Sequence, residues 1–398
     1  MLQSLLIKRI LKKNVLIRRL HVEKNIKPSY CYTNKLQFIN VHSSKIPVYG
    51  GFDDFSMLDN IAELRIDKEL LLRMYKNMIS LKVMDQILYE CQRQGRISFY
   101  MTNSGEEALQ IGSAAALDNS DLIYAQYREA GVLLWRGYKF DDFVNQCFGN
   151  DRDSNKGRQM PVHYGSKDLN FFTISSPLAT QLPQAVGSAY CLKDSKSNSC
   201  VVCYFGEGAA SEGDAHAAFN FAATLSCPVV FICRNNEYAI STPSHQQYAG
   251  DGIAARGPAF GISTIRVDGN DIMAMYHATQ FARKHAIDEQ RPVLVEAMTY
   301  RIGHHSTSDD SKTYRTAQEI NAYQEVSPLN RLKLILEKHG IWSNEKEENY
   351  LKLEKTSILE AISAAEARNC LSPENLFEDV YKTIPRNIAR QKQLLQRT

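Results

Sequence analysis

The sequence predicts an α/β fold: a parallel sheet flanked by helices, with an N-terminal arm and a helical C-terminal extension. Two short apolar runs, 201–205 and 228–233, are separated by a segment of helical spacing, the order that produces parallel strands and crossover helices. The same order returns in the runs 262–267 and 293–299. Because 44% of the 398 residues are hydrophobic, the chain can bury a large core without disulfides.

The chain opens with a basic segment. Lysine and arginine recur before the first acidic residue, Glu23, and leucine and isoleucine fall at roughly helical spacing. This pattern predicts a mitochondrial transit peptide over residues 1–27 and a single domain over residues 28–398. The alternative is a basic helix that stays on the protein. The sequence has no apolar run of about 18 residues, which argues against a membrane span.

The remaining elements are predicted from the spacing of apolar residues. We expect an extended arm over 28–60 and a short strand over 122–125. We expect helices over 66–94, 104–117, 130–136, 214–225, 272–287, 328–338, 345–368 and 374–382. The last three make up a polar extension that we expect to serve packing or a partner.

Charge and cysteine content narrow the class of protein. The net charge is only +3, and part of it lies in the first twenty residues, so composition gives no case for nucleic-acid binding. The nine cysteines are scattered, and Cys200 and Cys203 stand three apart on a predicted strand. Their side chains would point to opposite faces, so they could not hold one metal. We interpret the cysteines as buried small hydrophobes in a reducing compartment.

The sequence Gly206-Glu207-Gly208 follows one predicted strand and precedes a helix. Glycines in this position indicate phosphate binding, because the amides of a helix start face the anion. A dinucleotide fold would need a third glycine, where Ser211 stands, and an acidic residue at the end of the next strand. That strand ends in Asn235-Asn236 instead, which argues against a dinucleotide site.

A diphosphate bridged to Mg²⁺ fits these residues better. Mg²⁺ requires oxygen ligands in octahedral array. Glu207 offers a carboxylate at one strand tip, Asn236 a side-chain carbonyl at the next, and Tyr238 a backbone carbonyl just beyond. Tips of adjacent parallel strands lie together at the carboxyl edge of a sheet, where ligands bind.

The pairing of Gly-Glu-Gly with Asn-Asn about thirty residues on resembles the thiamine-diphosphate signature of 2-oxoacid dehydrogenases. The resemblance extends from about Ile46 to beyond Pro385. The segments 96–103, 157–165, 175–181, 206–236 and 299–315 are similar to α subunits of the branched-chain 2-oxoacid dehydrogenase decarboxylase component. This resemblance implies the thiamine-diphosphate-binding fold, with this chain supplying the diphosphate-binding half.

The resemblance also implies roles for individual residues. Glu207, Asn236 and Tyr238 would bind Mg²⁺. The residues implied in binding thiamine diphosphate are Gln126, Tyr127, Arg128, Ser176, Leu178, Gly208, Ala209, Arg234 and His305. A structural K⁺ site is implied at Ser175, Pro177, Thr180 and Gln181, where the alternative is a turn followed by a helix cap.

The segment His304-His305-Ser306 carries the remaining implied roles. His305 would be the catalytic histidine, moving protons or orienting intermediates, because an imidazole titrates near working pH. His304 would order the loop. Ser306 matches a phosphorylation site of the animal family, and phosphate there would repel the cofactor diphosphate.

Three departures from the family pattern stand out. Thr316 occupies the position of a second phosphosite that is usually serine, and Glu237 follows Asn-Asn where glycine is usual. The chain ends at Thr398, without the aromatic tail of the animal subunits.

The family's reaction needs partners. A β subunit would supply the catalytic glutamate in an α₂β₂ heterotetramer, and a lipoyl-bearing acyltransferase core would receive the acyl group. A regulatory kinase and phosphatase would act at Ser306. Two other functions remain open: a pyruvate or acetoin dehydrogenase α subunit, and a non-catalytic scaffold subunit. The expected location is the mitochondrial matrix.

Overall fold

The computed structural model describes residues 45–50, 66–195 and 198–396. The chain divides into Met1–Lys45 and Ile46–Thr398, and the second unit holds every element below. The predicted transit peptide and most of the predicted arm lie outside the described residues. Among the described helices, none is long and apolar enough to cross a membrane.

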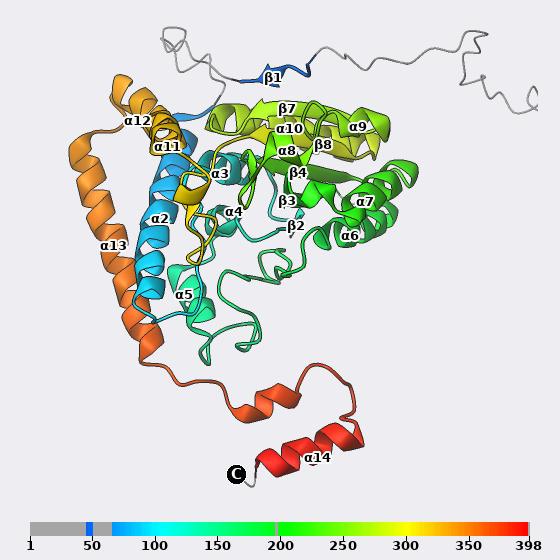
Figure 1. Cartoon of the computed structure of the whole chain (residues 1–398), viewed down its shortest axis with the longest axis vertical. Helices are drawn as coiled ribbons and strands as arrows, with labels where there is room; N and C mark the ends of the chain where they lie inside the picture. The colour runs from blue at the N-terminus through cyan, green and yellow to red at the C-terminus, as the bar shows by residue number, and fades with distance from the viewer. Residues whose placement is uncertain (1–44, 51–65, 196–197, 397–398) are drawn as a thin grey trace, which may run out of the picture. The chain divides into compact units, whose positions relative to one another are not determined.

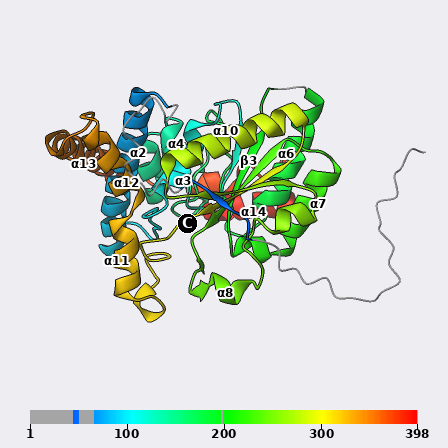
Figure 2. The same ribbon diagram turned by 90° about the horizontal axis from the view of Figure 1, so that it is seen from above.

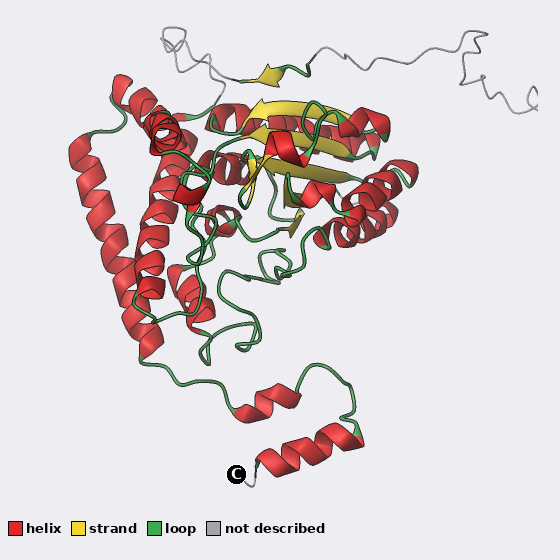
Figure 3. Ribbon diagram, viewed as in Figure 1, coloured by secondary structure: helices red, strands yellow, loops and turns green. Residues whose placement is uncertain are grey.

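A six-stranded parallel sheet forms the centre of the fold (Figures 1 and 3), confirming the predicted α/β class. Its strand order is β1-β7-β8-β4-β3-β2. The strands are β1 Val48–Tyr49, β2 Leu122–Tyr124, β3 Val201–Gly206, β4 Val229–Asn235, β7 Ser263–Asp268 and β8 Val293–Met298. A small antiparallel hairpin, β5 Tyr238–Ala239 with β6 Thr242–Pro243, follows the end of β4.

Helices cover both faces of the sheet (Figure 2). The larger core packs α3 and α10 against one face, and the smaller core packs α6 and α7 against the other. The helices up to α7 are α2 Lys68–Arg93, α3 Glu107–Ala115, α4 Ala130–Trp135, α5 Phe140–Phe148, α6 Gln181–Ser195 and α7 Gly213–Thr224. Those after it are α8 Ser244–Gln247, α9 Arg256–Ala259, α10 Ile272–Glu289, α11 Ala317–Glu325, α12 Pro328–Lys338, α13 Asn344–Glu366 and α14 Arg386–Leu395.

Most predicted elements are confirmed to within a few residues, but the end of the chain is not. The helix predicted over 374–382 is wrong: Pro373–Phe377 forms only a 3₁₀ turn, and Asp379 then adopts a left-handed φ of 64°. The helical segment comes later, as α14, with Pro385 as its N-cap residue. Helix α13 packs against α2 and α5, so this part of the extension serves packing as expected.

The cysteine interpretation is confirmed for most of the described residues. Cys200 and Cys203 are fully buried and belong to the cores on opposite faces of the sheet. Cys191 and Cys370 are exposed, so the general description of buried cysteines is wrong for these two.

Candidate active site

The two predicted strand ends meet at the carboxyl edge of the sheet. β3 and β4 pair in parallel with Gly206 opposite Arg234, so Glu207 and Asn236 each lie just past the strands' ends. The Asn236 backbone amide donates to Glu207 Oε2 at 3.3 Å. Glu207 is 2% exposed, and burial raises its pKa to about 7 although Arg234 opposes the shift. The Glu207 carboxylate is therefore a buried acidic group at the end of β3, held next to the first residue after β4.

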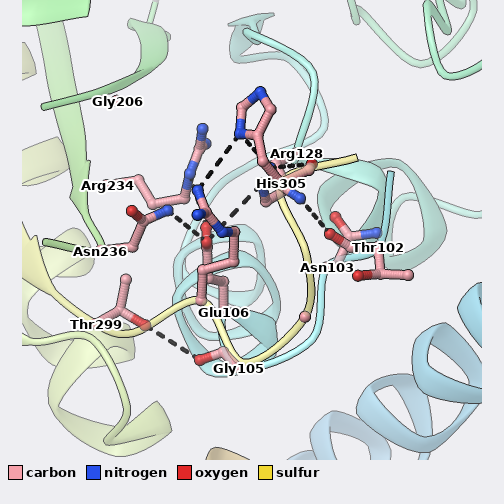
Figure 4. Close-up of polar contacts among 12 residues, drawn as sticks. Thr102, Asn103, Gly105, Glu106, Arg128, Gly206, Arg234, Asn236, Thr299 and His305 are labelled. Carbon is pink, nitrogen blue, oxygen red and sulfur yellow. Dashed lines mark hydrogen bonds and ion pairs between the residues drawn. The ribbon is translucent and has the colours of Figure 1, made fainter. Parts of the chain in front are cut away.

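A second acidic residue, Glu106, organises this edge and was not predicted from the sequence. It precedes α3 and is fully buried. Its Oε1 accepts a hydrogen bond from Asn236 Nδ2 at 2.7 Å, and its Oε2 lies 2.7 Å from Arg234 Nε (Figure 4). Because the Asn236 amide nitrogen is engaged by Glu106, its oxygen is turned the other way, where it accepts from the Tyr238 amide at 3.3 Å.

Two buried arginines supply positive charge beside these oxygens. Arg128 and Arg234 are 1% and 2% exposed, and both guanidinium groups lie 5.5 Å from the centre of the Tyr127 ring. Burial works against the charged form of Arg234, but Glu129 and Glu106 together raise its pKa. Arg128 Nε donates no hydrogen bond to any described residue and makes only a longer ion pair, 3.9 Å from Glu106 Oε1. A buried guanidinium donor without an acceptor suits an anionic ligand.

The loop that carries Arg128 is fixed by Glu129. Its carboxylate accepts from the backbone amides of Gln126 and Tyr127, both at 2.9 Å, and pairs with Arg234. The Gln126 side chain accepts from the Gly206 amide at 2.7 Å, which ties this loop to the end of β3. The predicted residues Gln126, Tyr127 and Arg128 are thus brought to the same edge as Glu207.

His305 lies against the same arginines. Its Nδ1 is 3.3 Å from both Arg128 Nη2 and Arg301 Nη1, and the Arg128 side chain also donates to its carbonyl at 2.8 Å. Guanidinium groups only donate, so Nδ1 must accept and the neutral ring carries its proton on Nε2. Burial, followed by the charges of Arg128 and Arg301, lowers the pKa of His305 to about 3 although Asp309 opposes the shift.

The family model of the dehydrogenase E1 component matches residues 75–374. The chain belongs to the dehydrogenase E1 component family. It is 55% identical over 369 residues to the human protein named 2-oxoisovalerate dehydrogenase subunit alpha, mitochondrial, covering 92% of this chain and 83% of that one. The Caenorhabditis elegans protein of that name is 55% identical over 365 residues, covering 91% and 84%.

An Arabidopsis thaliana relative, named 2-oxoisovalerate dehydrogenase subunit alpha 2, mitochondrial, is 50% identical over 370 residues, covering 92% of this chain and 78% of the relative. These matches confirm the resemblance to branched-chain α subunits that the motifs indicated. In this E1 chain the parallel sheet places the family's Gly-Glu-Gly and Asn-Asn segments on neighbouring strands, as predicted.

Ser306 and Thr307, which follow His305, are buried in this E1 chain, whereas Ser308 is exposed. Ser306 is 7% exposed, and its Oγ is 2.9 Å from Ser308 Oγ. The His305 amide donates to Asp309 Oδ2 at 2.8 Å. His304 accepts from the Ser311 amide through Nδ1 at 3.1 Å, so it orders the loop as expected.

The predicted contact of Gly208 and Ala209 with a helix start requires a correction. Gly208 precedes a 3₁₀ turn, Ala209–Ser211, and α7 begins only at Gly213. Glu212 is extended, with φ −71° and ψ 150°, which separates the turn from the helix. The two amides therefore belong to the turn and not to the N-terminus of α7.

Gly208 serves a second purpose, close packing. A Cβ on Gly208 would lie 2.8 Å from Ala239 Cβ, closer than carbon atoms approach. The segment after β3 and the hairpin after β4 can therefore meet only because residue 208 has no side chain. Tyr238, in that hairpin, donates through its hydroxyl to Glu319 at 3.0 Å.

The segment 175–181 makes hydrogen bonds of its own. Ser176 Oγ is 2.8 Å from His163 Nε2, Thr180 Oγ1 donates to the Pro177 carbonyl at 3.0 Å, and Gln181 Nε2 donates to Tyr204 of β3 at 3.0 Å. Ser175 and Leu178 are exposed, the latter by 42%. Among the described residues no hydrogen bond links this segment to Glu207 or Asn236.

Glu237, the departure from glycine, adopts a left-handed φ of 69°. Its carboxylate is hydrogen-bonded to Tyr323 of α11, and burial followed by the charge of Glu319 raises its pKa. The extra carboxylate is thus directed to α11. Thr316, the other departure, accepts from the Glu319 amide through its side chain and caps α11.

Proposed function

We propose that this protein is the α subunit of a mitochondrial enzyme that oxidatively decarboxylates branched-chain 2-oxoacids. It would act as 3-methyl-2-oxobutanoate dehydrogenase together with a β subunit and pass the acyl group to a lipoyl-bearing acyltransferase. The names of the relatives support the substrate and the location. The observation that carries the proposal is the buried edge where Glu207 and Asn236 lie beside Arg234.

The residues at this edge fit thiamine diphosphate, on which the E1 family depends. Arg128 and Arg234 would hold the diphosphate through guanidinium donors, and the Gly208 and Ala209 amides would face it. Tyr127 and Gln126 would keep the arginines in place. When bound, thiamine diphosphate supplies the nucleophilic carbon and the electron sink that decarboxylation requires.

Mg²⁺ would be bound by Glu207, by the side-chain oxygen of Asn236 and by the carbonyl of Tyr238, with diphosphate oxygens completing the shell. The hydrogen bond from Asn236 to Glu106 supports this assignment, because it fixes which end of the amide faces the cation. A divalent cation would also keep the Glu207 carboxylate ionised despite its burial.

K⁺ would be bound by oxygen atoms of Ser175, Pro177, Thr180 and Gln181. The Gln181 nitrogen is engaged by β3, which leaves its carbonyl oxygen as an acceptor. The Thr180 hydroxyl proton is used on Pro177, which leaves lone pairs on its oxygen. Ser176 and Leu178 would line the thiamine end of the cofactor from the same segment.

His305 would be the catalytic histidine. Its neutral ring, with the proton on Nε2, would donate to a developing oxyanion or to the incoming acyl acceptor. Phosphate on Ser306 would place negative charge beside Asp309 and against the ordered loop, so a kinase and phosphatase acting here would switch the enzyme. The expected assembly is the α₂β₂ heterotetramer.

The test is cofactor binding by the complex of this chain with its β subunit, measured calorimetrically with and without Mg²⁺. We expect tight, Mg²⁺-dependent binding of thiamine diphosphate. Arg234→Lys keeps the charge but loses the planar fork, and should weaken binding about tenfold. The control is Arg158→Lys, at a partly exposed arginine paired with Asp379. A folded complex that binds no thiamine diphosphate would contradict the proposal.

A further inference from the structure

Asp85 is a buried carboxylate inside α2 that accepts hydrogen bonds from one short segment, residues 100–104. Its exposed fraction is 3%. Its Oδ1 accepts from the Tyr100 hydroxyl at 2.9 Å and from Asn103 Nδ2 at 3.0 Å, and its Oδ2 accepts from the Asn103 backbone amide. Neither the sequence motifs nor the proposed function uses this carboxylate. A buried acceptor with several donors of one segment holds that segment in a single arrangement.

The same segment is paired with the loop that carries His305. The Tyr100 amide donates to Thr307 Oγ1 at 3.3 Å, and the Thr307 amide donates back to the Tyr100 carbonyl at 3.1 Å. The Ile302 amide donates to the Ser104 carbonyl at 3.0 Å. The loop is therefore attached to the segment on both sides of His305.

Arg128 connects the segment to His305 a second time. Its Nη1 donates to the Thr102 carbonyl at 2.5 Å, and its Nη2 donates to the His305 carbonyl at 2.8 Å (Figure 4). Asn103 Oδ1 accepts from Gln110 Nε2 at 3.1 Å, so the oxygen of this amide is also engaged. A displaced segment would therefore move the carbonyl that holds Arg128.

The segment and the loop also approach each other too closely to move independently. A Cβ on Gly105 would lie 2.1 Å from the Tyr300 carbonyl oxygen. A Cβ on Gly303 would lie 2.5 Å from Thr102 Oγ1. Because close-packed groups transmit displacements to their neighbours, a shift on one side must be followed on the other.

We infer that Asp85 is a positioning residue, which fixes the segment 100–104 and through it the places of Arg128 and His305. This rests on the proposed function, in which Arg128 holds the diphosphate and His305 is catalytic. Among the described residues, no hydrogen bond or ion pair joins Asp85 to either of them. We therefore expect the effect of the carboxylate to pass through the segment.

The test uses two variants that break and then rebuild this contact. Asp85→Asn keeps the size of the side chain but replaces one acceptor oxygen by a donor, so one N–H group of Asn103 loses its acceptor in either orientation of the new amide. The reciprocal variant combines Asp85→Asn with Asn103→Asp. There the new amide can accept from the backbone at position 103 and donate to the new carboxylate, which can still accept from Gln110.

Two further variants separate positioning from charge and from general stability. Tyr100→Phe removes one hydrogen bond to the carboxylate and changes no charge. The control is Asp121→Asn, at another fully buried carboxylate, which accepts from the Cys200 amide at 3.0 Å at the amino edge of the sheet. It should lower the melting temperature without a selective effect on the His305 loop.

Hydrogen exchange of the complex with the β subunit is followed by mass spectrometry on peptides that contain Ile302 and Thr307, relative to peptides from β4. We expect Asp85→Asn to speed exchange of the loop peptides about five- to twentyfold, and Tyr100→Phe to speed it less. Turnover of 3-methyl-2-oxobutanoate should fall through kcat by a similar factor. The reciprocal variant should restore both quantities to within about twofold of the unmodified complex.

Unchanged exchange of the loop in a folded Asp85→Asn complex, or an equal increase in β4, would overturn the inference. Faster exchange with unchanged turnover would overturn it as well. Should Asp85→Asn fail to fold, Tyr100→Phe decides, and unchanged loop exchange in that variant would overturn the inference. Absence of turnover in the unmodified complex would instead overturn the proposed function, while the exchange measurement would still test the contact between the segment and the loop.

Discussion

Gly208→Ala tests whether close packing of two loops creates the metal and diphosphate site. Gly208 has φ −64° and ψ −44°, which alanine adopts readily, so the substitution adds no backbone strain. The added Cβ would lie 2.8 Å from Ala239 Cβ, whereas carbon atoms pack at about 3.5–4.0 Å. The segments after β3 and β4 must therefore move apart by roughly 1 Å.

That displacement has two expected costs. Overpacking of this kind destabilises a protein by about 1–3 kcal/mol. Mg²⁺ requires near-ideal octahedral geometry at about 2.0–2.1 Å, so a shift of this size between Glu207 and the Tyr238 carbonyl should affect the metal more than the fold. We expect Mg²⁺-dependent binding of thiamine diphosphate to weaken about 10- to 100-fold, equivalent to about 1.4–2.8 kcal/mol.

The assay is calorimetric titration of the complex with thiamine diphosphate at several Mg²⁺ concentrations, with melting temperature as the measure of folding. Gly213→Ala is the matched control, because a Cβ there would meet nothing within 4 Å. Ala239→Gly in the Gly208→Ala background removes the clashing atom and should recover most of the affinity. Cofactor affinity within twofold of the unmodified complex for Gly208→Ala, or no recovery in the double variant, would refute the reasoning.

Three further predictions concern charge. Burial raises the pKa of Glu107 to about 8. The protonated side chain therefore stabilises the fold fully below the ordinary pKa near 4.5, and this stabilisation is lost as pH rises through 8. The unmodified protein should lose about 2 kcal/mol of stability between pH 6 and 8 through this group, and Glu107→Gln should not, so the variant's melting temperature should fall less over that range. Glu207 has a pKa of about 7, so Mg²⁺ affinity measured by titration should fall as pH drops below 7, because protons compete for the carboxylate; a flat profile from pH 8 to 5.5 would exclude it as a ligand. Ser306→Glu should abolish activity with the lipoyl carrier because residue 306 is buried beside an ordered loop, whereas Ser308→Glu, at an exposed position, should be tolerated.

The sequence was sufficient to predict the strand ends of this site. Glu207 and Asn236 follow continuous apolar runs that are typical of buried parallel strands, and parallel pairing places their tips together. Gly206 and the pair Asn235-Asn236 mark where those two strands end. The order of the six strands could not be predicted, because apolar runs of similar composition do not specify which neighbours they pair with.

Glu106 and Glu129 were missed for a physical reason. An acidic residue at the start of a helix usually serves the helix dipole on the surface, so nothing local marks Glu106 as buried. Only the fold brings it against Arg234 and Asn236 across long sequence separations. His163 was likewise invisible, because its partner Ser176 lies thirteen residues away on a separate strand-like segment. The helix misplaced over 374–382 reflects weak patterning in a segment with few core contacts.

The most direct test of the central claim is turnover by the purified complex of this chain with its β subunit. Dye reduction would be followed with 3-methyl-2-oxobutanoate and with pyruvate, each with and without thiamine diphosphate and Mg²⁺. The account predicts cofactor-dependent turnover that strongly favours the branched acid. Preference for pyruvate would contradict the substrate assignment, and a folded, cofactor-loaded complex that decarboxylates neither acid would contradict the enzymatic function itself.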